Sequence, residues 1–135
     1  MRNGQKRIKT AKITKIGHKI LSSIINNKQK KLYLGNLYAK RDWGHAKDYV
    51  VAMWKMLQQK KPDDYIIATG RQYSVKEFIN LTAKQLNMKV AWKGKGLKER
   101  GYWNGKIIVE IDKNYFRPTE VYSLKGDFTK AKKKL

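Results

Sequence analysis

A short apolar run that leads into a helix-capping sequence constrains the fold of this chain more than any other feature. Tyr65-Ile66-Ile67-Ala68 is apolar and ends at Thr69-Gly70, which is typical of a buried strand. Ser74-Val75-Lys76-Glu77 has the serine and the glutamate of a capping box, so a helix should begin there. The expected inner face of this helix consists of Phe78, Ile79 and Leu86. A strand followed by a helix indicates an α/β or α+β architecture.

Further segments alternate in the same way along the chain. Isoleucines recur at helical spacing between Ala11 and Asn26, at positions 13, 16, 20, 24 and 25, and predict a helix with one apolar stripe. A polar segment spans 39–47, and Asp48 is expected to cap a helix that ends before Pro62. That helix has a shared face of Val50, Met53, Trp54 and Leu57. Short strands are expected at 31–34, 88–92 and 107–111, a flexible Gly- and Lys-rich loop at 93–105, and a basic helix at 127–135.

The size and composition of the chain limit the classes of protein to be considered. Its 135 residues suggest one domain, and a hydrophobic content of 41% is too high for a disordered basic tail. Cysteine is absent, which excludes disulfides and thiolate metal sites. We find neither an apolar run long enough to cross a bilayer nor a secretory pattern, so a cytoplasmic location is expected.

The net charge of +22 admits two interpretations. Thirty-two Lys and Arg residues against ten Asp and Glu residues could form the footprint of a polyanion-binding protein, such as one that binds nucleic acid. The lysines are scattered in ones, twos and threes, however, and a general compositional drift toward Lys, Asn and Ile would also produce them. The scatter favours drift.

Several patterns imitate functional motifs. Tyr102 and Lys106 have the spacing of a short-chain dehydrogenase pair, but Gly105 and the loop-like surroundings argue against the helix that such a pair needs. The glycines between Gly94 and Gly101 are spaced wrongly for a dinucleotide fingerprint. His18 and His45 have no second metal ligand at a suitable spacing, so no metal site is predicted.

One long segment carries a specific resemblance. Residues 34–50, LGNLYAKRDWGHAKDYV, resemble a signature of GDP-mannose 4,6-dehydratases. Further matches to this family follow in its order: Ala52-Met53-Trp54, Leu57-Gln58-Gln59, Ile67-Ala68-Thr69-Gly70, Tyr115-Phe116-Arg117-Pro118-Thr119-Glu120-Val121, Gly126-Asp127 and Thr129-Lys130-Ala131-Lys132, with Lys12-Ile13-Thr14 upstream. The resemblance covers nearly the whole chain but less than half of the protein that is usual in the family.

The resemblance implies the C-terminal, substrate-binding part of an extended short-chain dehydrogenase/reductase. We therefore expect residues 1–135 to form a single GDP-sugar-binding region, a small mixed α/β fold without the complete Rossmann sheet. The family is an NADP-dependent lyase that converts GDP-mannose to GDP-4-keto-6-deoxymannose, on the route to GDP-fucose. Its Gly-rich cofactor loop and its catalytic Thr, Glu, Tyr and Lys have no counterpart in this sequence, so no catalytic residue is assigned. The chain alone is expected neither to bind NADP nor to be active.

Five residues are candidates for substrate binding. Arg41 and Arg117 could bind the diphosphate, because a diphosphate suits planar and always-charged donors. Glu120 could accept hydrogen bonds from the ribose hydroxyls, while Asn36 and Lys12 could bind the guanine or its ribose. Without the resemblance, Arg41 and Asp42 would be interpreted as a surface ion pair and Pro118 as a turn residue.

The sequence also departs from the family, which usually has an acidic residue at the positions of Tyr38, Val51, Arg71 and Tyr122. The expected partners of this chain are GDP-mannose or GDP, and either a separate Rossmann-domain chain or further copies of the chain itself. It could be a split subunit, a truncated copy or a repurposed binding module. The alternative function remains non-specific binding of nucleic acid or another polyanion through charge.

Overall fold

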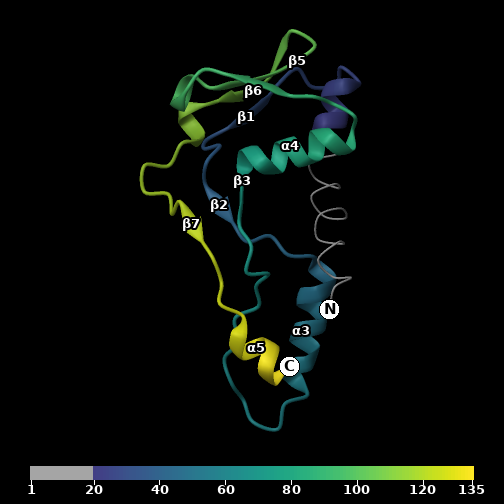
Figure 1. Ribbon diagram of the computed structural model, residues 1–135, viewed down its shortest axis with the longest axis vertical. Coiled ribbons are helices and arrows are strands. Elements are labelled where there is room, and N and C mark those ends of the chain that lie inside the picture. The colour runs from purple at the N-terminus through teal and green to yellow at the C-terminus, as the bar shows by residue number, and fades with distance from the viewer. Residues whose placement is uncertain (1–19) are drawn as a thin grey trace.

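The computed structural model describes residues 20–135 and shows an elongated molecule (Figure 1). One end contains a sheet with the helix α4 (Val75–Gln85), and the other contains the helices α3 (Ala46–Leu57) and α5 (Thr129–Lys134). A narrow set of short strands connects the two ends. The mixed α/β fold expected from the sequence is confirmed.

The larger sheet has four strands in the order β1-β6-β5-β4. These are β1 (Leu32–Leu34), β6 (Lys106–Ile111), β5 (Arg100–Trp103) and β4 (Ala91–Lys93). β1 pairs with β6 in parallel, whereas the other pairs are antiparallel. β5 and β6 form a hairpin around Asn104 and Gly105, which have φ values of 48° and 74°. Two central residues with positive φ are typical of a tight hairpin turn with an Asn-Gly sequence.

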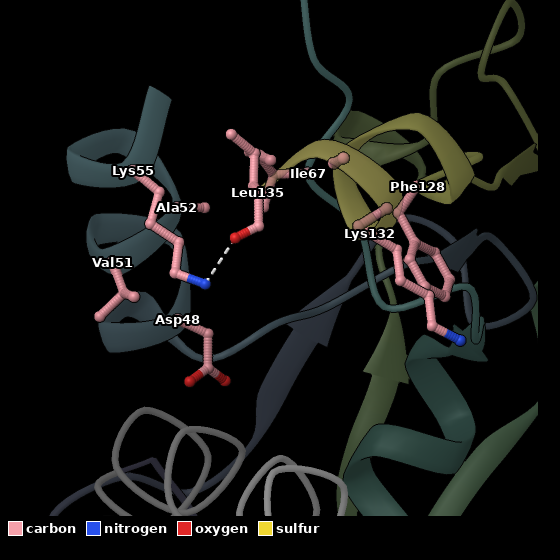
Figure 2. Close-up of a pocket in the computed structure, with 10 residues that line it drawn as sticks. Asp48, Val51, Ala52, Lys55, Ile67, Phe128, Lys132 and Leu135 are labelled. Atoms are coloured by element: carbon pink, nitrogen blue, oxygen red, sulfur yellow. Dashed lines mark hydrogen bonds between the residues drawn. The ribbon is translucent and has the colours of Figure 1, made fainter. Parts of the chain in front are cut away.

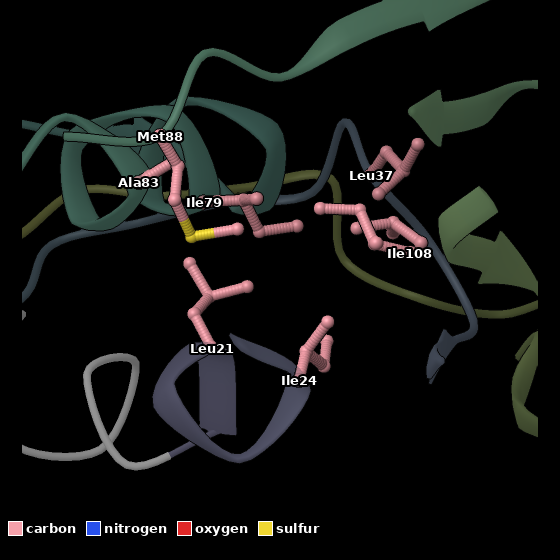
Figure 3. Packing of buried hydrophobic residues seen from close by; sticks show 8 residues of the cluster. Leu21, Ile24, Leu37, Ile79, Ala83, Met88 and Ile108 are labelled. Carbon is pink, nitrogen blue, oxygen red and sulfur yellow. The ribbon is translucent and has the colours of Figure 1, made fainter. Parts of the chain in front are cut away.

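The core lies between this sheet and the helical residues (Figure 3). Leu21 and Ile24, from the helical residues 20–25, approach Ile79 and Met88. Leu37, Ala83, Ile108 and Val109 complete the buried cluster. α4 begins with the expected capping box, because the Ser74 side chain accepts from the backbone N–H of Glu77 and the Glu77 carboxylate accepts from that of Ser74. Its N-terminus is therefore fixed where Ile79 can reach the core.

The smaller sheet has three strands in the order β3-β2-β7. β2 (Lys40–Arg41) lies in the centre, antiparallel to β3 (Tyr73–Ser74) and parallel to β7 (Ser123–Leu124). Two 3-10 turns, η1 (Gly96–Lys98) and η2 (Lys113–Tyr115), complete the described elements. Because β7 pairs beside Arg41, the chain just before β7 is brought next to that arginine.

The structure corrects several expectations. The run Tyr65-Ile66-Ile67-Ala68 belongs to no sheet, because no described strand pairs with it. His45 rather than Asp48 caps α3, with its Nδ1 accepting from the backbone N–H of Lys47 at 3.2 Å. The expected loop at 93–105 contains β5, and the polar segment 39–47 contains β2. The part of the first expected helix before residue 20 lies outside the described residues.

Candidate functional site

The structure brings two of the predicted site residues together. Arg41 Nη2 donates to Glu120 Oε1 at 2.9 Å, and both side chains are partly buried. Arg41 Nη1 also donates to the backbone carbonyls of Val121 and Lys40, at 2.7 and 2.8 Å. These bonds hold the guanidinium plane of Arg41 in one orientation. The guanidinium of a flexible surface arginine would not be fixed in this way.

Arg117 lies in the same turn as Glu120. The backbone N–H of Glu120 donates to the Arg117 carbonyl at 3.2 Å, and Pro118 lies inside this turn, as expected. The Arg117 side chain is exposed, and within the described part of the chain its guanidinium forms no ion pair. The turn therefore holds the positive charge of Arg117, which has no ion-pair partner among the described residues, close in the chain to Glu120.

Asn36 precedes these residues in the connection between β1 and β2. Its Oδ1 accepts from the backbone N–H of Tyr38 at 2.8 Å. Its Nδ2 is buried and has no hydrogen-bond partner among the described residues. A buried amide donor without a partner is unfavourable.

Asp42 does not pair with Arg41, so the surface ion pair considered for these neighbours is wrong. The Asp42 carboxylate instead accepts from the backbone N–H of Thr69 at 3.0 Å, from that of Gly70 at 2.8 Å and from the Thr69 hydroxyl. Gly70 has a φ of +72°, a conformation that favours glycine. Asp42 thus ties the end of β2 to the turn at 69–70.

A polar cluster that sequence reasoning missed lies between the connection that carries Asn36 and the larger sheet. Glu99 is only 3% exposed and accepts from Lys76 Nζ at 2.5 Å and from the Tyr38 hydroxyl. Burial alone would raise the pKa of Glu99, but the hydrogen bonds from Lys76 and Tyr38 outweigh it and lower that pKa. Lys76 Nζ also lies 5.0 Å from the centroid of the Trp92 ring. No local sequence pattern signals this cluster, because its members are far apart in the chain.

The structure also bears on the other candidate residue, Lys12, and on the patterns that imitate functional motifs. Lys12 and His18 lie outside the described residues. Tyr102 lies on β5 and Lys106 on β6, so the two residues share no helix. The described residues contain no cluster of His, Cys, Asp or Glu that could hold a metal ion, and no helix in that part of the chain is long and apolar enough to span a membrane.

The glycines of the expected loop do not fit a dinucleotide cofactor. Gly94 and Gly96 lie in the antiparallel connection between β4 and β5. A Rossmann phosphate site needs a turn from a strand into the N-terminus of a helix, because the helix N–H groups bind the pyrophosphate. No step of the chemistry is therefore assigned to a cofactor held by these residues.

A separate cavity lies between α3 and α5 (Figure 2). Its walls include Val51 and Lys55 of α3, Ile67, Phe128 and Leu135. Lys55 Nζ donates to the Leu135 carbonyl at 2.7 Å across it. Among the described substrate-binding candidates, none of Asn36, Arg41, Arg117 and Glu120 lines this cavity.

Comparison with solved structures shows a likeness of fold. The chain is similar to a protein of Burkholderia cenocepacia J2315 described as an epimerase, with a TM-score of 0.61 and 22% sequence identity. The match covers 88% of this chain and 34% of that one. The chain therefore shares the fold of about a third of that protein.

Sequence comparison identifies the family. A family model described as GDP-mannose 4,6 dehydratase matches residues 2–135. The GDP-mannose 4,6 dehydratase of Dictyostelium discoideum is 50% identical over 128 residues, which are 93% of this chain and 35% of the relative. The GDP-mannose 4,6-dehydratase of Vibrio cholerae is 47% identical, over 85% of this chain and 34% of the relative. That of Homo sapiens is 54% identical, over 76% and 28%.

The chain belongs to the GDP-mannose 4,6-dehydratase family. It spans about a third of the length of the relatives that it matches, and it corresponds to their C-terminal part. The family membership predicted from residues 34–50 and from the ordered matches is confirmed. The alternative of a polyanion-binding protein has no support among these relatives.

Proposed function

We propose that this chain is the substrate-binding region of a GDP-mannose 4,6-dehydratase and that it binds the GDP part of GDP-mannose. The observation that carries the proposal is the assembly of Arg41, Glu120 and Arg117 from two distant parts of the chain. Arg41 and Glu120 are 79 residues apart in sequence, and both belong to segments that match the family.

The contacts of these side chains suggest a separate role for each. Arg117 has the accessible positive charge that a diphosphate requires. Arg41 is fixed by Glu120 and by two carbonyls, so it would present its guanidinium at little entropic cost when the diphosphate binds. Glu120 uses Oε1 for Arg41, so its second carboxylate oxygen could accept from a ribose hydroxyl. The unpartnered Nδ2 of Asn36 is proposed to donate to the guanine or its ribose, a role also proposed for Lys12.

The same proposal assigns no catalysis to the isolated chain. NADP would accept a hydride from the sugar and then return it in the complete enzyme, but the described residues provide no site that fits this cofactor. We propose that a separate Rossmann-domain polypeptide, or an assembly that contains one, completes the enzyme. A cytoplasmic location agrees with the absence of cysteine, because reduced compartments do not favour disulfides.

Calorimetric titration with GDP-mannose tests this proposal. The full chain should bind, and Arg117→Ala should weaken the affinity by about tenfold or more, since a hydrogen bond to a charged group contributes on the order of 1.5–3 kcal/mol. Arg100→Ala is the matched control, because Arg100 lies on β5 and pairs with Glu110 away from the candidate site. Equal affinities of the two variants would show that Arg117 does not contact the ligand.

A further inference from the structure

One hydrogen bond decides which polar atom of the Asn36 side chain can meet a ligand. Its Oδ1 accepts from the backbone N–H of Tyr38 at 2.8 Å, and only the oxygen of an amide group can accept in this way. The amide cannot turn over without losing this bond. The buried Nδ2, which has no partner among the described residues, is therefore held as the donor that remains. Its complement in a ligand is an acceptor atom.

The backbone around Tyr38 is fixed by the first turn of α4. The Lys76 N–H donates to the Leu37 carbonyl at 2.9 Å. The Val75 N–H donates to the Ala39 carbonyl at 3.3 Å. The first N–H groups of a helix have no acceptor inside it, so they are available for such contacts. The Leu37 side chain is fully buried in the core and anchors the same connection (Figure 3).

Glu99 joins the side chains of these same two segments. Its Oε2 accepts from the Tyr38 hydroxyl, and its Oε1 accepts from Lys76 Nζ at 2.5 Å. Both carboxylate oxygens are therefore in use in a side chain that is almost fully buried. Hydrogen bonds to an ionised group are roughly twice as strong as those between neutral groups. Glu99 thus holds the β1–β2 connection against the start of α4 from the side that faces the larger sheet.

Gly35 places this connection next to the segment that carries Arg117. A Cβ at Gly35 would lie only 1.9 Å from the Tyr115 carbonyl oxygen, so the two backbones are in contact. Asn36 follows Gly35 directly, and Arg117 is two residues beyond Tyr115. The fixed amide and the arginine proposed to bind the diphosphate therefore belong to neighbouring backbone segments.

We propose that Tyr38 and Glu99 are positioning residues that orient Asn36 for recognition of the base of the nucleotide. Their hydrogen bond keeps the connection in place, so that Asn36 Nδ2 stays turned as a donor. Guanine has the acceptor O6 where adenine has an amino donor, and two donors that face each other are both left unpaired. The cluster thereby favours guanine over adenine without touching the ligand. This inference rests on the proposed function, because it explains how one of the proposed binding residues is oriented.

Nuclear magnetic resonance of the full, nitrogen-15-labelled chain tests the positioning step without any ligand. The side-chain NH2 signals of Asn36 are assigned by their loss in Asn36→Asp. Tyr38→Phe removes only the hydroxyl that binds Glu99, and it should speed exchange of the Asn36 NH2 protons with water by about fivefold. The backbone amide of Val109 in the core should be unaffected, whereas a general loss of stability would speed both.

The matched control is Tyr65→Phe. It removes the same atom from a tyrosine beside α5, where the Lys130 ammonium lies 5.5 Å from the ring centroid. This variant should leave the exchange of the Asn36 NH2 protons unchanged. Equal exchange of these protons in Tyr38→Phe and in Tyr65→Phe would overturn the positioning role.

Calorimetric titration with GDP-mannose and ADP-mannose then tests recognition of the base. The preference of the chain for GDP-mannose should fall by about fivefold in Tyr38→Phe. In an Asn36→Ala background Tyr38→Phe should have no further effect, because two residues that act through one contact are not additive. Additive effects would overturn the inference. If Tyr38→Phe loosens Asn36 but the unsubstituted chain binds no GDP-mannose, the proposed function is wrong and the guanine preference falls with it, while the positioning of the amide is confirmed.

Discussion

Replacing Lys76 with methionine should destabilise the chain by about 3 kcal/mol, because it leaves the buried carboxylate of Glu99 without its charged partner. Removal of one member of a buried ion pair typically costs about 3–5 kcal/mol. The lower end applies, since the Lys76 side chain is 26% exposed and the Tyr38 hydroxyl still donates to Glu99. Methionine retains most of the aliphatic stem, so the change in packing against Trp92 is small.

Urea unfolding monitored by tryptophan fluorescence measures this effect. A loss of about 3 kcal/mol lowers the urea midpoint by about 1–3 M for an ordinary urea dependence of about 1–3 kcal/mol/M. The double variant Lys76→Met, Glu99→Gln removes the charge together with its partner, so it should recover a large part of the loss. If Lys76→Met costs less than about 1 kcal/mol, or if the two substitutions are additive, Glu99 is not held by Lys76 as described.

The same cluster predicts a dependence on acid. The pKa of Glu99 is lower in the folded chain than its ordinary value of 4.5, so the folded state binds its proton less readily than the unfolded state. The stability from Glu99 is therefore present above pH 4.5 and lost as the pH falls through the lowered pKa. Glu99→Gln should flatten the fall in unfolding free energy below pH 4.5, although Glu77 and Glu110, whose pKa values are also lowered, will keep part of it.

Three further substitutions test the packing and the site. Leu37→Ala should destabilise the chain by about 3 kcal/mol, measured by urea unfolding, because Leu37 is fully buried in the core. Gly35→Ala should reduce the melting temperature, measured by circular dichroism, since an added Cβ would lie only 1.9 Å from the Tyr115 carbonyl oxygen; an unchanged melting temperature would contradict this close approach. Asp42→Asn should speed hydrogen exchange at the amide of Gly70 while leaving that of Val109 protected, because the carboxylate binds the turn at 69–70.

Local signals in the sequence were sufficient for several elements. The capping box at Ser74 placed the start of α4, and the apolar run at 107–111 identified most of β6. Asn104-Gly105 was an available signal for the β5–β6 hairpin, but the expectation of a flexible loop overlooked it. Residues 65–68 show the opposite error, because an apolar run indicates a preference for strand but not the presence of a partner strand.

The candidate site was harder to predict from local sequence patterns. Arg41 and Glu120 are 79 residues apart, so no spacing rule joins them, and the family resemblance alone suggested that they act together. The contact between Tyr38 and Glu99 spans 61 residues and depends on how the β1–β2 connection meets the larger sheet. β2 and β7 are far apart in the sequence, and their pairing in the folded chain determines which residues surround Arg41.

Calorimetric titration of the full chain with GDP-mannose, ADP-glucose and a short duplex DNA, at two salt concentrations, distinguishes a GDP-sugar site from a polyanion-binding surface. We expect binding of GDP-mannose in preference to ADP-glucose, with an affinity that survives the higher salt. Binding of DNA that weakens steeply with salt, without selective binding of GDP-mannose, would contradict this expectation, because such behaviour is expected of a polyanion-binding surface.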